Sequence, residues 1–70
     1  MANGKRLLLK QLRVAQGDAS QEKFSEMIGV DRQYYSKVEN GKIRGNEAFW
    51  MKLQERFGLS DGDIWRMMKE

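Results

Sequence analysis

The stretch QEKFSEMIGVDRQYYSKV, residues 21–38, decides the fold of this 70-residue chain. Its apolar side chains recur at helical spacing on both sides of Gly29, at Phe24, Ile28, Val30, Tyr35 and Val38. The spacing predicts two short helices joined by a turn of three or four residues, crossing at a steep angle. Gly29 suits the turn because glycine readily adopts the left-handed conformation that ends a helix sharply. Ser25 is small, so it lets the second helix approach the first.

Three more helices are expected outside this pair. The chain is therefore predicted to be all-α, a compact five-helix bundle that forms a single domain over residues 1–70. Good capping residues, Ser20 and Asp31, precede the two helices of the pair, which spans about residues 20–40. The other helices are expected over about residues 5–16, from residue 46 or 47 to residue 57, and after a capping box at residues 60–63.

Composition narrows the possible functions. The chain has no Cys and no His, so a Cys-based metal site is excluded and no catalytic constellation stands out. We therefore expect no enzyme activity, cofactor, metal or small-molecule ligand. The longest apolar run, Leu7 to Leu9, is far too short to span a bilayer. The protein is expected to be soluble and cytoplasmic, without a membrane partner.

Positive charge is concentrated in two segments. The formal net charge is +3, but residues 1–17 carry four Lys or Arg and no acidic residue. Residues 42–44 add Lys42 and Arg44, again without an acid. Local positive patches govern the choice of partner more than the total charge does. Two such patches on either side of the predicted helix pair favour a polyanion as the partner.

Several short motifs occur in a characteristic order between residue 12 and about residue 68. They are Leu12-Arg13 before Gly17, Ser20-Gln21, Phe24-Ser25, Ile28-Gly29-Val30, Val38-Glu39-Asn40-Gly41-Lys42 and Gly58-Leu59-Ser60. This order resembles the helix-turn-helix family of lambdoid phage repressors, Cro proteins and their bacterial relatives. The resemblance implies a bundle of five helices that binds double-stranded DNA, usually as a homodimer, and regulates transcription. Ser25 and Tyr35 depart from the family pattern, which prefers Ala and a β-branched residue there.

The second helix of the pair carries the residues expected to read base edges. The resemblance and the outward position on this helix select Arg32, Gln33, Ser36 and Lys37. Arg and Lys match the acceptors of guanine in the major groove, and Gln matches adenine. Asp31 is expected to cap the helix rather than to touch DNA, because its charge repels phosphate.

A second set is expected to grip the sugar-phosphate backbone, which fixes the register without reading sequence. It comprises Gln21, Tyr34, Asn40, Lys42, Arg44 and Arg13. The alternative for Tyr34 is packing at the edge of the core. The resemblance also implies that Arg13 pairs with Glu39 and locks the reading helix to the scaffold, and Gly29 and Glu39 are therefore assigned structural roles.

The C-terminal helix is expected to form the interface of a two-fold dimer. The residues predicted to be exposed in one chain and buried between two are Leu59, Ile64, Trp65 and Met68. The sequence thus predicts a transcription regulator, chiefly a repressor, that acts as a dimer on a palindromic operator, with activation left open. The alternative is a protein-interaction module, such as an antitoxin or a co-regulator subunit with the same fold.

Overall fold

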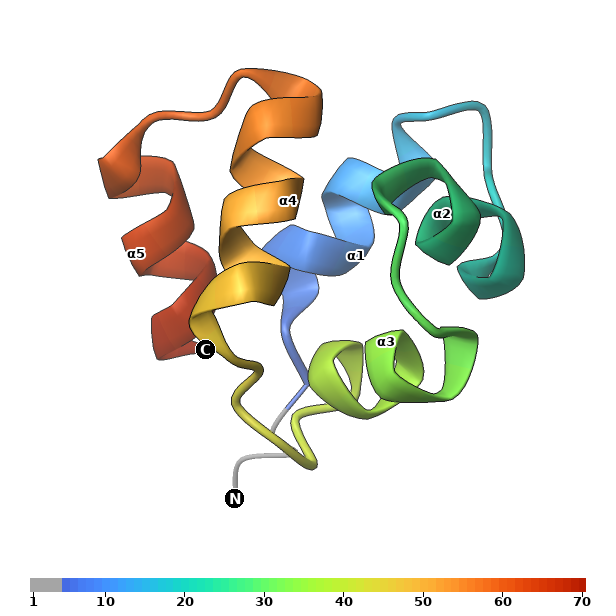
Figure 1. The fold of residues 1–70 in the computed structure, drawn as a ribbon, viewed down its shortest axis with the longest axis horizontal. Helices are drawn as coiled ribbons and strands as arrows, with labels where there is room; N and C mark the ends of the chain where they lie inside the picture. Colours follow the sequence, from blue (N-terminus) through green and yellow to red (C-terminus); the bar gives the residue numbers. More distant parts are fainter. Residues whose placement is uncertain (1–4) are drawn as a thin grey trace.

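The structure is a computed structural model that describes residues 5–70, so the first four residues of the predicted domain lie outside the described part. Within residues 5–70 it contains five helices and no strand (Figure 1). They are α1 (Leu7–Val14), α2 (Gln21–Ile28), α3 (Arg32–Glu39), α4 (Glu47–Phe57) and α5 (Asp61–Lys69). The all-α fold with five helices is confirmed. Over this range, no helix combines the length and the hydropathy that a membrane crossing would require.

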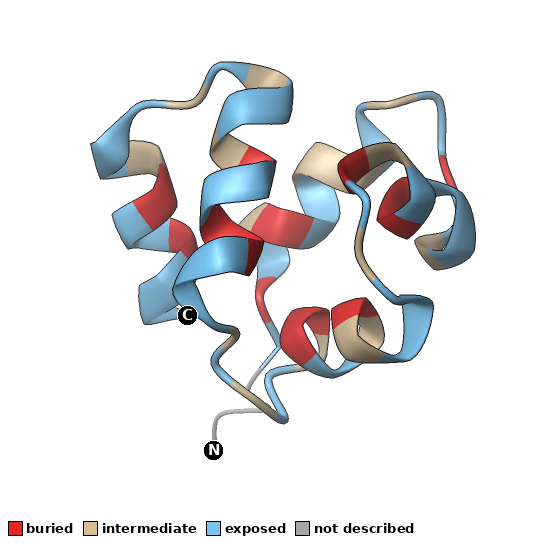
Figure 2. Cartoon of the chain, in the orientation of Figure 1, coloured by how far each residue is buried: buried red, intermediate tan, exposed pale blue. Residues whose placement is uncertain are grey.

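Helix α1 lies in the middle of the bundle. Helices α4 and α5 stand on one side of it, and the α2–α3 pair lies on the other (Figure 1). All five helices turn buried residues toward this centre, as the red segments of Figure 2 show. The core consists of Leu9, Ala19, Phe24, Ile28, Tyr35, Val38, Phe49, Trp50, Leu53, Ile64 and Met67.

Aromatic rings join the helix pair to α4. Phe24 of α2 packs against Tyr35 of α3 and against Phe57 of α4, with ring centroids 5.3 and 5.4 Å apart. The ring of Phe49 in α4 also lies near that of Tyr35, with centroids 6.2 Å apart. Ring pairs at these distances add to the free energy gained by burying apolar area. The α2–α3 corner is therefore fixed against the rest of the bundle.

The helix boundaries follow the capping signals of the sequence. The N-cap side chains of α2 to α5 each accept a hydrogen bond from the backbone N–H three residues later: Ser20, Asp31, Asn46 and Ser60. This satisfies one of the N–H groups left without a partner at each helix start. At the other end of α2, Gly29 has φ +75°, in the left-handed region, as predicted.

Helix α1 is shorter than predicted. It was expected over residues 5–16 but runs from Leu7 to Val14. Arg6 is extended rather than helical, and its backbone N–H donates to the Glu39 carbonyl at 2.8 Å. At the start of α1, the Leu8 N–H donates to the Glu70 carboxylate at 2.7 Å. The two ends of the described chain therefore meet beside α1, an arrangement that periodicity alone does not predict.

Candidate nucleic-acid interface

Helix α3 has a buried face and an exposed face. Tyr35, Val38 and Glu39 are buried, whereas Arg32, Gln33 and Lys37 are exposed. Ser36 is partly exposed, and it accepts a hydrogen bond from the Asn40 amide at 3.3 Å. The structure therefore brings the four residues predicted to read bases onto one accessible side of α3. Asp31 caps this helix by accepting from the Tyr34 N–H at 3.1 Å, as predicted.

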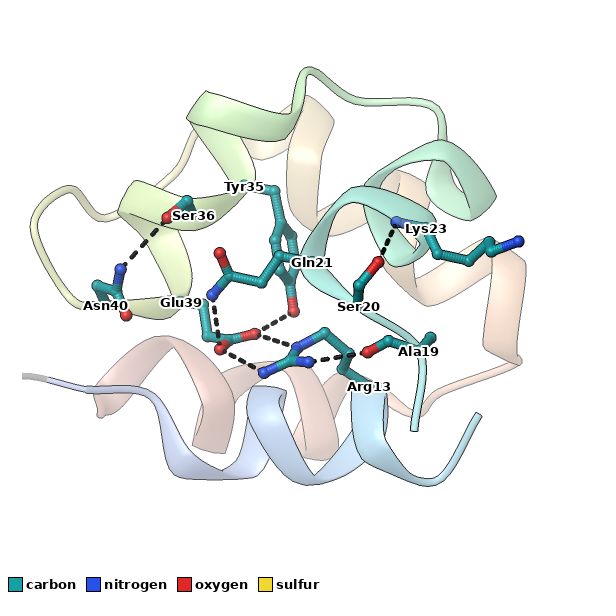
Figure 3. Close-up of polar contacts among 9 residues, drawn as sticks. All are labelled: Arg13, Ala19, Ser20, Gln21, Lys23, Tyr35, Ser36, Glu39 and Asn40. Carbon is teal, nitrogen blue, oxygen red and sulfur yellow. Dashed lines mark hydrogen bonds and ion pairs between the residues drawn. The ribbon is translucent and has the colours of Figure 1, made fainter. Parts of the chain in front are cut away.

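The Glu39 carboxylate at the end of α3 accepts four hydrogen bonds (Figure 3). One oxygen accepts from Arg13 Nε at 2.9 Å and from the Tyr35 hydroxyl at 2.5 Å. The other accepts from Arg13 Nη2 and from Gln21 Nε2, each at 3.0 Å. These donors fill the lone-pair sites of an ionised carboxylate. We call these four residues the Glu39 network; it ties α3 to α1 through Arg13 and to α2 through Gln21, and it confirms the predicted Arg13–Glu39 pair.

The ionisation of the Glu39 network follows from these contacts. Burial by itself raises the pKa of Glu39, but the hydrogen bonds from Arg13, Tyr35 and Gln21 outweigh burial and hold this pKa below its ordinary value. Burial, together with the bond to Glu39, raises the pKa of the Tyr35 hydroxyl well above its ordinary value. The bond to Glu39 also raises the pKa of Arg13. The network therefore holds a charged Arg–Glu pair and a neutral Tyr.

Four of the six residues predicted to contact the DNA backbone have internal side-chain partners: Gln21 and Asn40, whose bonds are given above, and Arg13 and Tyr34. Arg13 uses its third donor, Nη1, on the Ala19 carbonyl at 2.8 Å, so its guanidinium is bonded to the scaffold at every nitrogen. The Tyr34 hydroxyl accepts from the Asn46 N–H at 2.8 Å, and its ring packs against Phe49 at 5.9 Å. Tyr34 therefore lies at the edge of the core, which agrees with the alternative considered for it.

The loop between α3 and α4 carries exposed cations on a fixed backbone. Lys42 and Arg44 are exposed, and the Lys42 N–H donates to the Lys37 carbonyl at 2.8 Å. Trp50 Nε1 donates to the Arg44 carbonyl at 3.1 Å. Gly45, directly after Arg44, has φ +89°, and a Cβ there would lie 3.0 Å from Trp50 Nε1, so this position favours glycine.

Arg6 is a positioning residue that sequence reasoning missed. It is 5% exposed, and its Nη1 donates to the Val38 carbonyl at 2.6 Å and to the Ile43 carbonyl at 3.0 Å. Burial lowers its pKa, and the nearby charge of Arg44 adds to this effect. Arg6 thus fastens the end of α3 and the following loop to the N-terminal segment. In the sequence it is one of several cations before α1, and no local signal distinguishes it from Lys5.

The outer face of α5 is apolar and exposed. Trp65 is 58% exposed and Met68 36%, while Leu59 is partly buried. Trp65, Met68 and Ile64 line a groove of about 520 Å³, together with Arg44, Asp61 and Lys69. Ile64 itself is only 8% exposed in the single chain, so the prediction that it is exposed is wrong. It shares the inward face of α5 with Met67, three residues later, and both belong to the core.

The sequence is similar to known proteins. A family model described as helix-turn-helix matches residues 9–64. The chain is similar to the Control protein C.MunI from Mycoplasma sp, with 56% identity over 57 residues, which cover 81% of this chain and 77% of that protein. No solved structure matches the chain.

Proposed function

The chain belongs to the helix-turn-helix family of DNA-binding transcription regulators, and on this premise we propose that it reads one specific operator by placing α3 in the major groove. The observation that carries this proposal is the exposed face of α3, with Arg32, Gln33 and Lys37 on a helix held by the Glu39 network. A helix fixed from behind by charged hydrogen bonds presents its outward side chains in one orientation. Base-edge hydrogen bonds need that precision because they are directional.

The two sets of contacts have different tasks. Arg32, Gln33, Ser36 and Lys37 make the sequence-specific contacts with base edges. Gln21, Asn40, Lys42 and Arg44 hold the sugar-phosphate backbone on either side of α3, with the N-terminus of α2 contributing partial positive charge. Arg13 acts chiefly as a scaffold for Gln21 and α3. Tyr34 accepts one hydrogen bond from Asn46 and keeps its own hydroxyl proton for a phosphate oxygen.

The protein acts as a homodimer joined through α5. The groove beside Trp65 and Met68 supplies an apolar centre, and its lining also includes both signs of charge, the acid Asp61 and the cations Lys69 and Arg44. A two-fold interface places each patch against itself, so the acid of one chain can face the cations of the other. Two copies related in this way place their α3 helices in successive major grooves, about 34 Å apart, on a palindromic operator. Repression follows when the bound dimer covers a promoter.

Selection of bound sites from a pool of random duplex DNA tests the function. We expect an enriched palindromic site whose half-sites are one helical turn apart, and a complex that weakens steeply as salt rises. A site without internal symmetry would overturn the dimer but not DNA reading. A protein that forms no salt-sensitive complex with any DNA would instead favour the interaction-module alternative, which the exposed Trp65 face also suits. In that case the next experiment would measure binding to a protein partner instead of DNA.

A further inference from the structure

A second apolar surface lies on the outer face of α1. Leu7 is 50% exposed and Val14 is 41% exposed. Both line an open groove of about 470 Å³, whose other lining residues are Lys10, Gln11 and Ala15. Scattered exposed apolar side chains are ordinary, but adjoining ones that line a groove are typical of an interaction surface. Among the large apolar side chains exposed within residues 5–70, only this pair and the pair on α5 are grouped in this way.

The direction of this groove follows from the helical spacing of α1. Leu7 and Val14 are two helical turns apart, so their side chains lie on one side of the helix, about 10 Å from each other along the axis. The core residue Leu9 lies on the opposite side. Arg13, which rises from α1 toward Glu39 of α3 in Figure 3, is about 100° from Val14 around the axis. The groove therefore faces solvent and is turned away from the core and from the Glu39 network.

The charge beside the groove is positive. Residues 5–17 carry four Lys or Arg and no acidic residue. Lys10 lies about one turn from both Leu7 and Val14, and within the described part of the chain its ammonium forms no hydrogen bond or ion pair. Two carboxylates that other segments bring to α1 are already bonded, Glu39 by Arg13 and Glu70 by a backbone N–H. A partner that covers this groove is therefore expected to bring a negative charge to Lys10.

We propose that the outer face of α1 docks an acidic amphipathic helix of another protein. Such a helix carries apolar side chains two turns apart, which match Leu7 and Val14, and an acidic side chain between them that meets Lys10. A two-fold contact between two copies of this groove would set Lys10 against Lys10, so charge disfavours a second copy of the chain as the occupant. The inference goes beyond operator reading and does not rest on it, because it gives the regulator a separate face for a protein partner.

Titration with two synthetic helical peptides tests the charge and the place of this contact. The first peptide carries Leu at positions i, i+4 and i+7 of one face, with Glu at the flanking positions, and the second carries Lys in place of Glu. Amide chemical shifts of the full chain are followed as each peptide is added up to about 1 mM, the range of weak association. We expect saturable shifts along residues 7–15 with the Glu peptide and none with the Lys peptide.

Two variants separate the charge from the apolar contact. Lys10→Glu replaces an attraction by a repulsion, so it should weaken binding of the Glu peptide by roughly three- to ten-fold and allow the Lys peptide to bind. Val14→Lys places a charge in the apolar groove and should weaken binding of the Glu peptide roughly ten-fold, as expected when one Val side chain no longer packs. Met51→Lys is the matched control, because Met51 is an apolar side chain of similar exposure on α4. Circular dichroism checks that all three variants keep the fold.

The other outcomes of the titration would overturn the proposal. Absence of saturable shifts, or equal binding of the two peptides, would exclude a charge-selected partner. Shifts centred on Trp65 and Met68 would place the peptide in the groove of α5 instead. Displacement of the Glu peptide by random duplex DNA would assign the outer face of α1 to the nucleic-acid surface. Wild-type protein that binds no DNA would overturn operator reading alone, because the peptide contact with α1 needs no DNA.

Discussion

Helices α3 and α5 have nearly the same length and begin with the same kind of cap, yet their inner faces differ. The inner side of α3 carries Glu39, whose four hydrogen bonds reach α1, α2 and α3 itself. The inner side of α5 carries Ile64 and Met67, which contact the core without any polar bond from their side chains. The outer side of α3 is polar, and the outer side of α5 displays Trp65.

The difference suits the two kinds of recognition that we propose for this chain, base reading by α3 and self-association through α5. Hydrogen bonds between charged groups are directional, so they fix the rotation of α3 about its axis. Apolar contacts are non-directional, so Ile64 and Met67 bury the inner face of α5 without fixing its rotation. In the described part of the chain, polar bonds hold this helix only at its ends, from Gln54 to Asp61 and from the Leu8 N–H to Glu70. Reading bases needs the first kind of support. An apolar interface between two copies tolerates non-directional support, because its side chains can repack when they are buried between the copies.

Loss of Arg13 should have the largest effect. Arg13→Ala leaves the buried Glu39 carboxylate without its counter-ion, and we expect it to lower the free energy of unfolding by about 3–5 kcal/mol. The counterpart on α5 is Arg66→Ala, which breaks the exposed pair with Asp63 and should cost under about 1 kcal/mol. Urea denaturation of both variants gives the comparison. Equal losses would mean that α3 is no more dependent on its ion pair than α5.

Truncation of Trp65 should act on assembly and not on folding. Trp65→Ala removes the exposed centre of the α5 groove, and we expect it to weaken the dimer by about 2 kcal/mol, roughly 30-fold. Leu7→Ala, at another exposed apolar side chain, serves as the control. Analytical ultracentrifugation measures the dimer dissociation constant. A constant that Trp65→Ala leaves unchanged would exclude this face as the interface.

Truncation of Arg32 should act on sequence reading. Arg32→Ala removes a proposed base reader from the first turn of α3, and we expect specific binding to weaken by roughly 1–3 kcal/mol, with one base preference relaxed. The ion pair that Arg32 makes with Glu22 is exposed and long, at 3.8 Å, so its loss should barely alter stability. Competition binding against single-base operator variants measures the effect. An equal loss on random DNA would remove Arg32 from the reading set.

Acid should weaken the support of α3 more than that of α5. The pKa of Glu39 is lower in the folded protein than its ordinary value of 4.5, so its contribution to stability is complete above about pH 4.5. That contribution is lost as pH falls through the folded-state pKa. Glu39→Gln should therefore flatten the dependence of unfolding free energy on pH below about 4.5. The hydrogen bonds between Asp63 and Ser60 lower the pKa of the exposed Asp63 carboxylate. Asp63→Asn removes that carboxylate and should flatten the pH dependence of the unfolding free energy less than Glu39→Gln does. Urea denaturation of both variants at a series of pH values below about 4.5 measures the two pH dependences.

Loss of Lys42 should have the smallest effect. Lys42→Ala removes one exposed cation from the loop, and we expect it to weaken all DNA sequences alike and to lower the salt slope by about one. Because the backbone N–H of residue 42 still donates to the Lys37 carbonyl, the loop should keep its shape. Anisotropy on operator and random duplexes measures both slopes. A loss of affinity confined to the operator would mean that Lys42 contacts base edges rather than the sugar-phosphate backbone.

Local signals predicted most of the fold. Caps such as Ser20 and Asp31 and the stop at Gly29 act within four residues, so the bounds of α2 to α5 could be placed closely from the sequence. The four candidate base readers fall on the exposed side of α3 because helical spacing separates them from Tyr35 and Val38. Their contact with DNA stays a prediction. The Arg13–Glu39 pair came from the resemblance to a family, not from spacing.

Long-range contacts could not be predicted. Arg6 lies 32 residues from Val38, and the sequence shows its charge but not the carbonyls that it reaches. Glu70 bonds the backbone of Leu8 across 62 residues, which no periodicity encodes. The wrong prediction that Ile64 is exposed has a different cause. Two apolar stripes on α5 are offset by one residue, and which stripe faces inward depends on where α1 and α4 lie.

The two indoles of this chain differ in surroundings, and this makes them separate optical reporters. Trp50 is buried and bonded to the Arg44 carbonyl, whereas Trp65 lies open on α5. Emission from a sheltered indole lies at shorter wavelength than emission from a hydrated one, and a hydrated one is quenched more readily by iodide. Variants that keep one ring each, with Phe at the other site, would let a spectrometer follow the loop beside α3 and the pairing of two chains as independent signals in the same buffer.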